Sequence, residues 1–323
     1  MSIRAAIHQL THYKYDRPVS LGPHIVRLRP APHAHARVIS HSLKASPGEH
    51  FVNHHQDPYG NWLSRFVFPE LVRELRIEVD LVADMTAVNP FDFFVEDGAE
   101  VWPFEYGEDL RPDLVIYRTP EAAGPWLQAF LKGVDRAPRP TVDFAVDLNR
   151  RLAREIKYVN RMEPGVQSPD ETLEIGAGSC RDSGWLLVQI LRHLGLAARF
   201  VSGYLIQLKL DLVALDGPAR TDRDLADLHA WAEVYIPGAG WIGLDPTSGL
   251  LAGESHIPLA AAPHYRNAAP ITGAASFANV DFSFDTRVMR VAEQTHEPRL
   301  TGGRDDGKPG GADLAAVERQ RSV

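Results

Sequence analysis

The sequence predicts an α+β protein in which a β-sandwich-like domain precedes helices packed on an antiparallel sheet. Three observations support this fold class. Short apolar runs separated by turn residues fill residues 1–118, an apolar helix pattern lies near the middle of the chain, and strand-like runs follow it. With 323 residues, the chain is long enough for two domains with buried cores. We therefore predict a β-rich domain over 1–118, a second domain over 119–300 and a disordered tail over 301–323.

The composition excludes several classes of protein. A hydrophobic fraction of 44% and a charged fraction of 24% are ordinary for a globular protein. The net charge is −8, so the chain lacks the overall positive charge that is typical of a nucleic-acid-binding protein. No stretch approaches the roughly 18 apolar residues of a membrane span, and the first residues lack the apolar segment of a secretory signal. We expect a cytoplasmic protein with no nucleic-acid partner, no membrane partner and no cofactor.

The β-rich region begins the chain, and two of its elements are well defined by pattern. The segment 51–68 contains the turn sequence D-P-Y-G-N at 57–61, so it predicts a β-hairpin. The segment 74–83 alternates between apolar and polar residues and predicts a half-buried strand. The apolar positions of that strand are Leu75, Ile77, Val79 and Leu81.

Histidines are concentrated at the start of the chain, where nine of the 14 precede residue 56. Histidine-rich tracts can bind metal ions. The segment is predicted to form strands rather than helices, so we expect surface and hairpin histidines and no metal site. The nine are His8, His12, His24, His33, His35, His41, His50, His54 and His55.

Helix signals begin after the β-rich region. Thr119 followed by Pro120 is typical of a helix start. Thr141 is a candidate N-cap for a second helix that ends near Tyr158, because apolar residues recur there at every fourth position. The strongest pattern covers 179–194, with Ser179 as the N-cap, and it is apolar on most sides.

Three strand-like runs follow the strongest helix, at 198–208, 228–236 and 241–245. The turn sequence P-G-A-G at 237–240 joins the last two runs into a hairpin. The Gly-rich, charged segment 301–323 has no apolar period and predicts disorder.

The only cysteine of the chain, Cys180, follows the predicted N-cap of the strongest helix. Unpaired backbone N–H groups and the helix dipole favour a thiolate at that position. A thiolate nucleophile needs a base, and the base needs an orienting group. His229 and Asp245 lie on the two strands of the predicted hairpin and are candidates for the base and the orienting group. Alternatively, the three are a buried small residue, a core histidine and a turn cap.

The hairpin must pair in one register for these residues to meet. Side chains directly opposite each other in an antiparallel pair share a face of the sheet. Asp245 therefore shares the His229 face if Tyr235 pairs with Trp241, or if a pairing shifted by one residue contains a β-bulge. We predict the former pairing or its bulged equivalent, which makes His229 a diagonal neighbour of Asp245 at about 7–8 Å between Cα atoms.

The segments around these residues resemble the bacterial transglutaminase-like superfamily. The likeness covers roughly residues 140–272, and the first 100 or so residues are similar to the β-rich region that precedes such cores. It implies a papain-like core with Cys180 as nucleophile, His229 as general base and then acid, and Asp245 as orienting residue. The segments that carry it are C-R-D at 180–182, G-L-A-A-R-F-V-S-G-Y at 195–204, H-A-W-A-E-V at 229–234 and W-I-G-L-D-P-T at 241–247.

The resemblance implies acyl transfer through a cysteine thioester on a peptide or protein substrate with an amide bond. We favour hydrolysis, because water is the default acceptor unless a dry site excludes it. The alternatives are a transglutaminase that uses an amine acceptor, and a non-catalytic peptide-binding or assembly module. The likeness to the N-terminal part of larger bacterial proteins also implies a partner domain or protein that corresponds to their C-terminal part.

Four further residues are candidates for the site. Gln167 and Asn160 are rival candidates for the second oxyanion donor, beside the backbone N–H of the nucleophile. Either can equally be a solvated loop amide. Tyr204 and Trp231 are candidates for the walls of the cleft, or else core aromatics.

Overall fold

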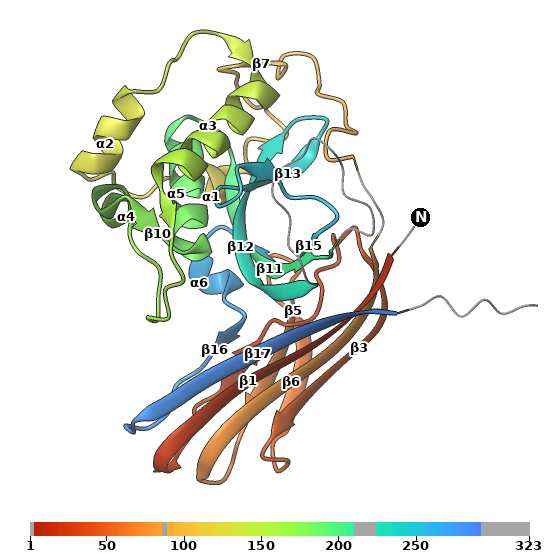
Figure 1. Cartoon of the computed structure of the whole chain (residues 1–323). Helices are drawn as coiled ribbons and strands as arrows, with labels where there is room; N and C mark the ends of the chain where they lie inside the picture. The colour runs from red at the N-terminus through yellow and green to blue at the C-terminus, as the bar shows by residue number, and fades with distance from the viewer. Residues whose placement is uncertain (1–2, 86–88, 210–223, 292–323) are drawn as a thin grey trace, which may run out of the picture. The chain divides into compact units, whose positions relative to one another are not determined.

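Two four-stranded antiparallel sheets form the β-rich part of the protein. The computed structural model describes residues 3–85, 89–209 and 224–291 of the chain. Figure 1 shows the first sheet as one curved layer. Its strands, in spatial order, are β17 (Val280–Val291), β1 (Ile3–Val19), β6 (Val72–Met85) and β3 (Arg37–Ser46). The strands of the second sheet, in spatial order, are β16 (Ile271–Thr272), β2 (His24–Val26), β5 (Trp62–Val67) and β4 (Phe51–Gln56).

The two sheets share one apolar core, as a sandwich does. The alternating residues of β6 that the sequence marked as apolar are all buried in it, and Val26 and Phe66 reach it from the second sheet. β4 and β5 pair as the predicted hairpin around the turn at 57–61. Each of these sequence predictions is confirmed.

The last described strand returns to the first one. β17 pairs with β1 along twelve residue pairs, from Arg4 with Val291 to Tyr15 with Val280. The β-rich sheets therefore contain residues from both ends of the described chain, and the described residues belong to one compact unit. The boundaries expected at 118 and 300 stay predictions, and the expected tail at 301–323 lies outside the described residues.

The helices lie between the two β-rich segments of the chain. None of those in the described ranges is long and apolar enough to cross a membrane. They are α1 (Val115–Arg118), α2 (Pro125–Lys132), α3 (Thr141–Glu155), α4 (Pro169–Ile175), α5 (Cys180–His193) and α6 (Tyr265–Ala268). Short strand pairs join this region: β7 (Val101–Trp102) with β8 (Arg139–Pro140), and β9 (Lys157–Tyr158) with β10 (Ala177–Gly178).

Two predicted helix starts are wrong. Thr119 ends α1, because its backbone N–H and hydroxyl both donate to the carbonyl of Val115, and the next helix begins only at Pro125. Thr141 is the first residue of α3 and not its N-cap. Its hydroxyl donates instead to the carbonyl of Ala99, so a tertiary contact takes the place of the predicted local one.

The central sheet has five antiparallel strands and lies against α5 (Figure 1). Helix α5 ends before Gly195, whose φ of 87° suits glycine, and eleven of its residues are buried, as its apolar pattern predicts. The strands, in spatial order, are β14 (Leu250–Leu251), β13 (Gly240–Asp245), β12 (Leu225–Ile236), β11 (Ala198–Gln207) and β15 (His256–Ala262).

The hairpin of β12 and β13 has the register that the site requires. Tyr235 pairs with Trp241, and the pairs continue without a bulge to Ala232 with Leu244. The same register extends one pair further into the turn than expected, to Ile236 with Gly240. Asp245 therefore lies on the same face of the sheet as His229.

Candidate active site

The first turn of α5 holds Cys180, which is partly exposed. The N-cap Ser179 donates from its backbone N–H (2.8 Å) and from its hydroxyl (2.7 Å) to the Oδ2 atom of Asp182. Asp182 thus complements the start of the helix. The cysteine is fixed at the amino end of a buried helix whose backbone N–H groups point toward it.

The Asp182 carboxylate is completely buried and carries an ion pair. Arg161 Nε lies 3.0 Å from its Oδ2 atom, and the backbone N–H of Gln167 donates to its Oδ1 atom at 2.8 Å. Burial opposes ionisation, but these partners and Ser179 outweigh it and hold the pKa of Asp182 below its ordinary value. Arg181 donates to the carbonyls of Arg161 and Glu163, so the chain before α4 is tied to the start of α5.

His229 and Asp245 face each other across the β12–β13 hairpin. His229 Nε2 lies 3.2 Å from Asp245 Oδ2, and both side chains are buried. The Asp245 carboxylate is held by its own turn: the Thr247 N–H (2.9 Å) and hydroxyl (2.6 Å) donate to Oδ1, and the Ser248 hydroxyl (2.9 Å) donates to Oδ2. The turn therefore holds the carboxylate in place independently of its contact with the imidazole.

Cys180 completes this arrangement, because its side chain is near enough to His229 to favour the charged imidazolium. Because Nε2 faces Asp245, Nδ1 is the ring nitrogen left for the thiol. Burial disfavours the charged imidazolium, but the hydrogen bonds and charges of Asp245 and Cys180 outweigh it and raise the pKa of His229 to about 10. Burial likewise opposes the Asp245 carboxylate, yet His229, His256 and Thr247 hold the pKa of Asp245 far below its ordinary value.

Two parts of the chain match models of known protein families. Residues 5–84 match the bacterial transglutaminase-like N-terminal region, and residues 128–246 match the transglutaminase-like superfamily. The second match contains all three residues of the triad. Residues 128–246 form a transglutaminase-like core.

Similar proteins include uncharacterised proteins from Mycobacterium bovis and Mycobacterium tuberculosis. Each is 28% identical over 288 residues, which cover 84% of this chain and 87% of the relative. A candidate cysteine protease from Cytophaga hutchinsonii has a similar solved structure, with a TM-score of 0.65, 17% identity and coverage of 97% of this chain and 95% of the other. At that identity the likeness shows the fold of this transglutaminase-like protein.

The two oxyanion candidates lie in different environments. Gln167 lies beside the segment that leads into the nucleophile helix, since its Oε1 atom is 3.3 Å from the position that a Cβ on Gly178 would occupy. The same oxygen accepts from Thr172 at 3.2 Å, which leaves the Gln167 Nε2 group as its donor. Asn160 is exposed. The environment of Gln167 favours it over Asn160.

The two cleft-wall candidates are core residues of the transglutaminase-like fold. Tyr204 is fully buried in the core of the β-rich sheets and its hydroxyl donates to Gln9, so its expected place in the cleft is wrong. Trp231 is also buried, with its ring centroid 6.4 Å from that of His229. A strand's alternation places these side chains on a face but does not reveal what covers it.

Sequence reasoning missed two residues near the triad. His256, the first residue of β15, lies near Asp245, and nothing in the local sequence G-E-S-H marks it. Tyr158 of β9 pairs with Gly178 and is 53% exposed. Partial burial, together with the nearby Cys180 and the site carboxylates, raises the pKa of Tyr158.

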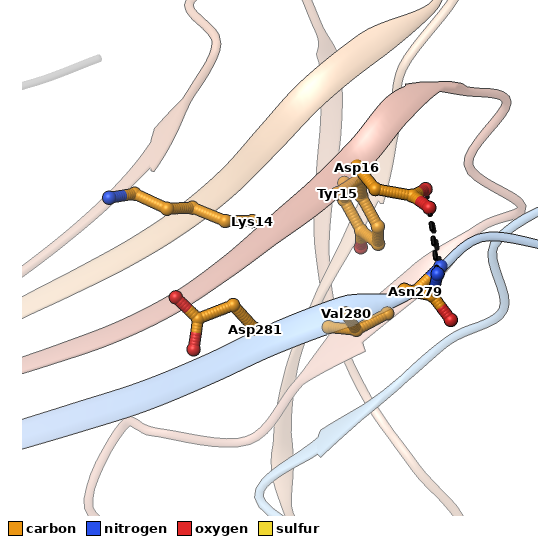
Figure 2. A pocket seen from close by; sticks show the side chains of 6 residues that line it. All are labelled: Lys14, Tyr15, Asp16, Asn279, Val280 and Asp281. Carbon is orange, nitrogen blue, oxygen red and sulfur yellow. Dashed lines mark hydrogen bonds between the residues drawn. The ribbon is translucent and has the colours of Figure 1, made fainter.

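A depression elsewhere on the protein shares no residue with the triad. It lies between β1 and the start of β17, with a volume of about 340 Å³. Figure 2 shows Asp16 hydrogen-bonded to Asn279 at one side of it, while the side chains of Lys14 and Asp281 lie apart. Asp16 is also paired with Arg17, so its carboxylate is already engaged.

Proposed function

We propose that this protein is a cysteine hydrolase that cleaves amide bonds of peptides or proteins through a Cys180 thioester. The observation that carries the proposal is the position of His229, which lies between the Cys180 thiol and the Asp245 carboxylate. The family and the protease-like neighbour fold support the reaction class.

Acylation begins from a thiolate and an imidazolium. An imidazolium with a pKa near 10 holds its proton at neutral pH, and that proton is available to the leaving group. The Cys180 sulfur forms a bond to the substrate carbonyl carbon, and the π electrons move to the oxygen. When the C–N bond breaks, His229 donates its proton to the leaving amine, and a thioester remains on Cys180.

Deacylation reverses these roles. Neutral His229 accepts a proton from water, and the hydroxide attacks the thioester carbonyl. The C–S bond then breaks, the acid product leaves, and Cys180 returns as the thiolate beside the imidazolium. Asp245 stays ionised throughout and keeps Nε2 of His229 directed at itself, so that Nδ1 faces the reacting atoms.

The negative oxygen of each tetrahedral intermediate needs two hydrogen-bond donors. The backbone N–H of Cys180 lies in the first turn of α5, where amides have no partner within the helix. We assign the second donor to the Gln167 amide. The exposed ring of Tyr158, which pairs with Gly178 just before Cys180, offers a surface for the substrate chain.

Incubating the purified chain with a library of glutamine-containing peptides, with and without a dansylated primary amine, tests the proposal. Mass spectrometry should detect hydrolysed peptides in both reactions and none with the Cys180→Ala variant. Amine incorporation in place of hydrolysis would identify an amine acyltransferase. Product formation that survives in the Cys180→Ala variant would refute a thiol mechanism.

A further inference from the structure

A second histidine approaches the carboxylate of the triad from a different strand. His256 Nε2 lies 3.6 Å from Asp245 Oδ2, while His229 Nε2 lies 3.2 Å from the same oxygen. The His256 side chain is only 7% exposed. Its Nε2 atom is buried and has no partner within 3.5 Å among the described residues, so the Asp245 oxygen at 3.6 Å is the acceptor that it faces. A buried nitrogen of this kind is costly unless the nearby oxygen engages it.

Local hydrogen bonds select the tautomer of His256. The backbone N–H of Gly253 donates to Nδ1 at 3.3 Å, so Nδ1 acts as an acceptor. The Ser255 hydroxyl lies 3.1 Å from the same nitrogen and can also donate to it. In a neutral imidazole the proton is then on Nε2, the nitrogen that faces Asp245. His256 thus presents an N–H group to the carboxylate.

The packing around His256 fixes its ring in this position. The ring lies edge-on to Trp231, with centroids 5.1 Å apart and an interplanar angle of 78°. Trp231 in turn occupies the space above Gly203, where a Cβ atom would lie 2.4 Å from the indole. Gly203 pairs with His229 on β12 and with Pro258 on β15. The glycine therefore lets the indole span from the triad to the β15 histidine.

We propose that His256 is a positioning residue whose Nε2–H group holds the Asp245 carboxylate in the orientation that orders His229. This inference rests on the proposed function. His256 contributes the donor that the turn residues do not: Thr247 and Ser248 approach from the chain after Asp245, whereas His256 approaches from β15. Asp245 is thereby held between elements from opposite edges of the central sheet.

A metal site is the competing interpretation of the same three side chains. One ligand atom each from His229, Asp245 and His256 lies within 4.8 Å of the others. A metal ion on Nε2 of His256 would require the proton on Nδ1, where the Gly253 N–H already points. It would also displace His229 from Asp245. The hydrogen bonds therefore favour a proton donor over a metal ligand.

The rate of Cys180 alkylation by iodoacetamide tests the proposal in the full chain. Because Cys180 is the only cysteine, the label reports on this thiol alone. Ordinary thiols react slowly in acid because they are protonated. The readout is the ratio of the second-order rate constants at pH 6 and pH 9, measured for the wild type, His256→Leu, His256→Gln and His256→Asn. Circular dichroism confirms that each variant is folded.

We expect His256→Leu to lower this ratio by about tenfold, the scale of one lost hydrogen bond to a charged group. His256→Gln, whose amide can replace the Nε2–H donor, should stay within about twofold of the wild type. His256→Asn is too short to reach Asp245 and should resemble the leucine variant, so the two amides carry the comparison if leucine prevents folding.

Several results would overturn the assignment. If His256→Leu or His256→Asn keeps the wild-type ratio of alkylation rate constants at pH 6 and pH 9, the positioning role is refuted and the proposed function is unaffected. Equal loss in the glutamine and asparagine variants would show that a donor is not what matters. Calorimetric binding of Zn²⁺ to the wild type that His256→Gln abolishes would make His256 a ligand. By contrast, a wild-type thiol no more reactive at pH 6 than the urea-unfolded chain would refute the thiolate–imidazolium pair itself.

Discussion

The Asp245→Asn substitution should change how the stability of the protein depends on pH. In the folded protein the pKa of His229 is raised from 6.5 to about 10. Between these values the folded state holds a proton that the unfolded chain has lost. The stabilisation from His229 is therefore complete below pH 6.5 and is lost as the pH rises toward 10. Asparagine removes the negative charge that holds this proton.

The size of the effect follows from the same shift. Each unit of pKa corresponds to about 1.4 kcal/mol, so the rise to about 10 corresponds to about 5 kcal/mol from Asp245 and Cys180 together, net of burial. Asp245 makes the largest favourable contribution, so we assign it about 3 kcal/mol. The depressed pKa of Asp245 sets the acid limit, since its contribution is present above its unfolded value and is lost as the pH falls.

Urea denaturation followed by tryptophan fluorescence, in steps from pH 5 to pH 10, measures the free energy of unfolding of both proteins. We expect the wild type to exceed Asp245→Asn by about 3 kcal/mol near pH 6. The difference in free energy of unfolding should narrow steadily toward pH 10, because His229 of the wild type loses its proton there. Groups that titrate equally in both proteins cancel in this difference. Asp109→Asn, at an exposed turn, is the matched control and should show no such trend. A difference of equal size at pH 6 and pH 9.5 would refute the reasoning.

Three more substitutions test the surroundings of the site. Gly203→Ala inserts a Cβ atom 2.3 Å from a backbone carbonyl oxygen, so we expect the free energy of unfolding, measured by urea denaturation, to fall by about 3 kcal/mol. Gly107→Ala, with open space around the new Cβ atom, is the control and should cost little stability. Arg161→Leu leaves a completely buried carboxylate without its cation and should cost about 3 kcal/mol. Arg17→Leu, at an exposed pair, should cost far less, and equal losses would contradict this. Cys180→Ala should abolish peptide hydrolysis and leave the melting temperature within a few degrees of the wild type; retained hydrolysis would exclude the thiol.

Local patterns were enough to predict most elements of the fold. The alternation in β6 and the apolar faces of α5 each reflect burial within a single segment, and a single segment can be read alone. The predicted helix start at Thr119 failed because the same Thr-Pro signal fits the end of a helix, and a hydroxyl bond to Val115 decided between them. The place of β17 beside β1 was beyond prediction, since strand order depends on pairing across the whole chain.

The proximity of His229 and Asp245 and the place of Cys180 at a helix start could be predicted because the geometry of a hairpin and of a helix start is local. A helix start positions Cys180, and one hairpin register positions His229 and Asp245. Parity along two strands was sufficient to choose that register. Tyr204 was misplaced for the opposite reason: what covers its face is the β-rich core, which comes from residues far away in the chain.

His256 shows where this kind of inference ends and what could extend it. It reaches Asp245 from β15, and in the central sheet β12 and β11 lie between the strands of these two residues. No spacing in the sequence encodes such an approach. The one local trace is Gly203 on the intervening strand β11, where any side chain would collide with Trp231 and the backbone of β15. A glycine inside a strand weakens it unless something must come close. At this position the indole comes close, and it links the triad histidine to His256.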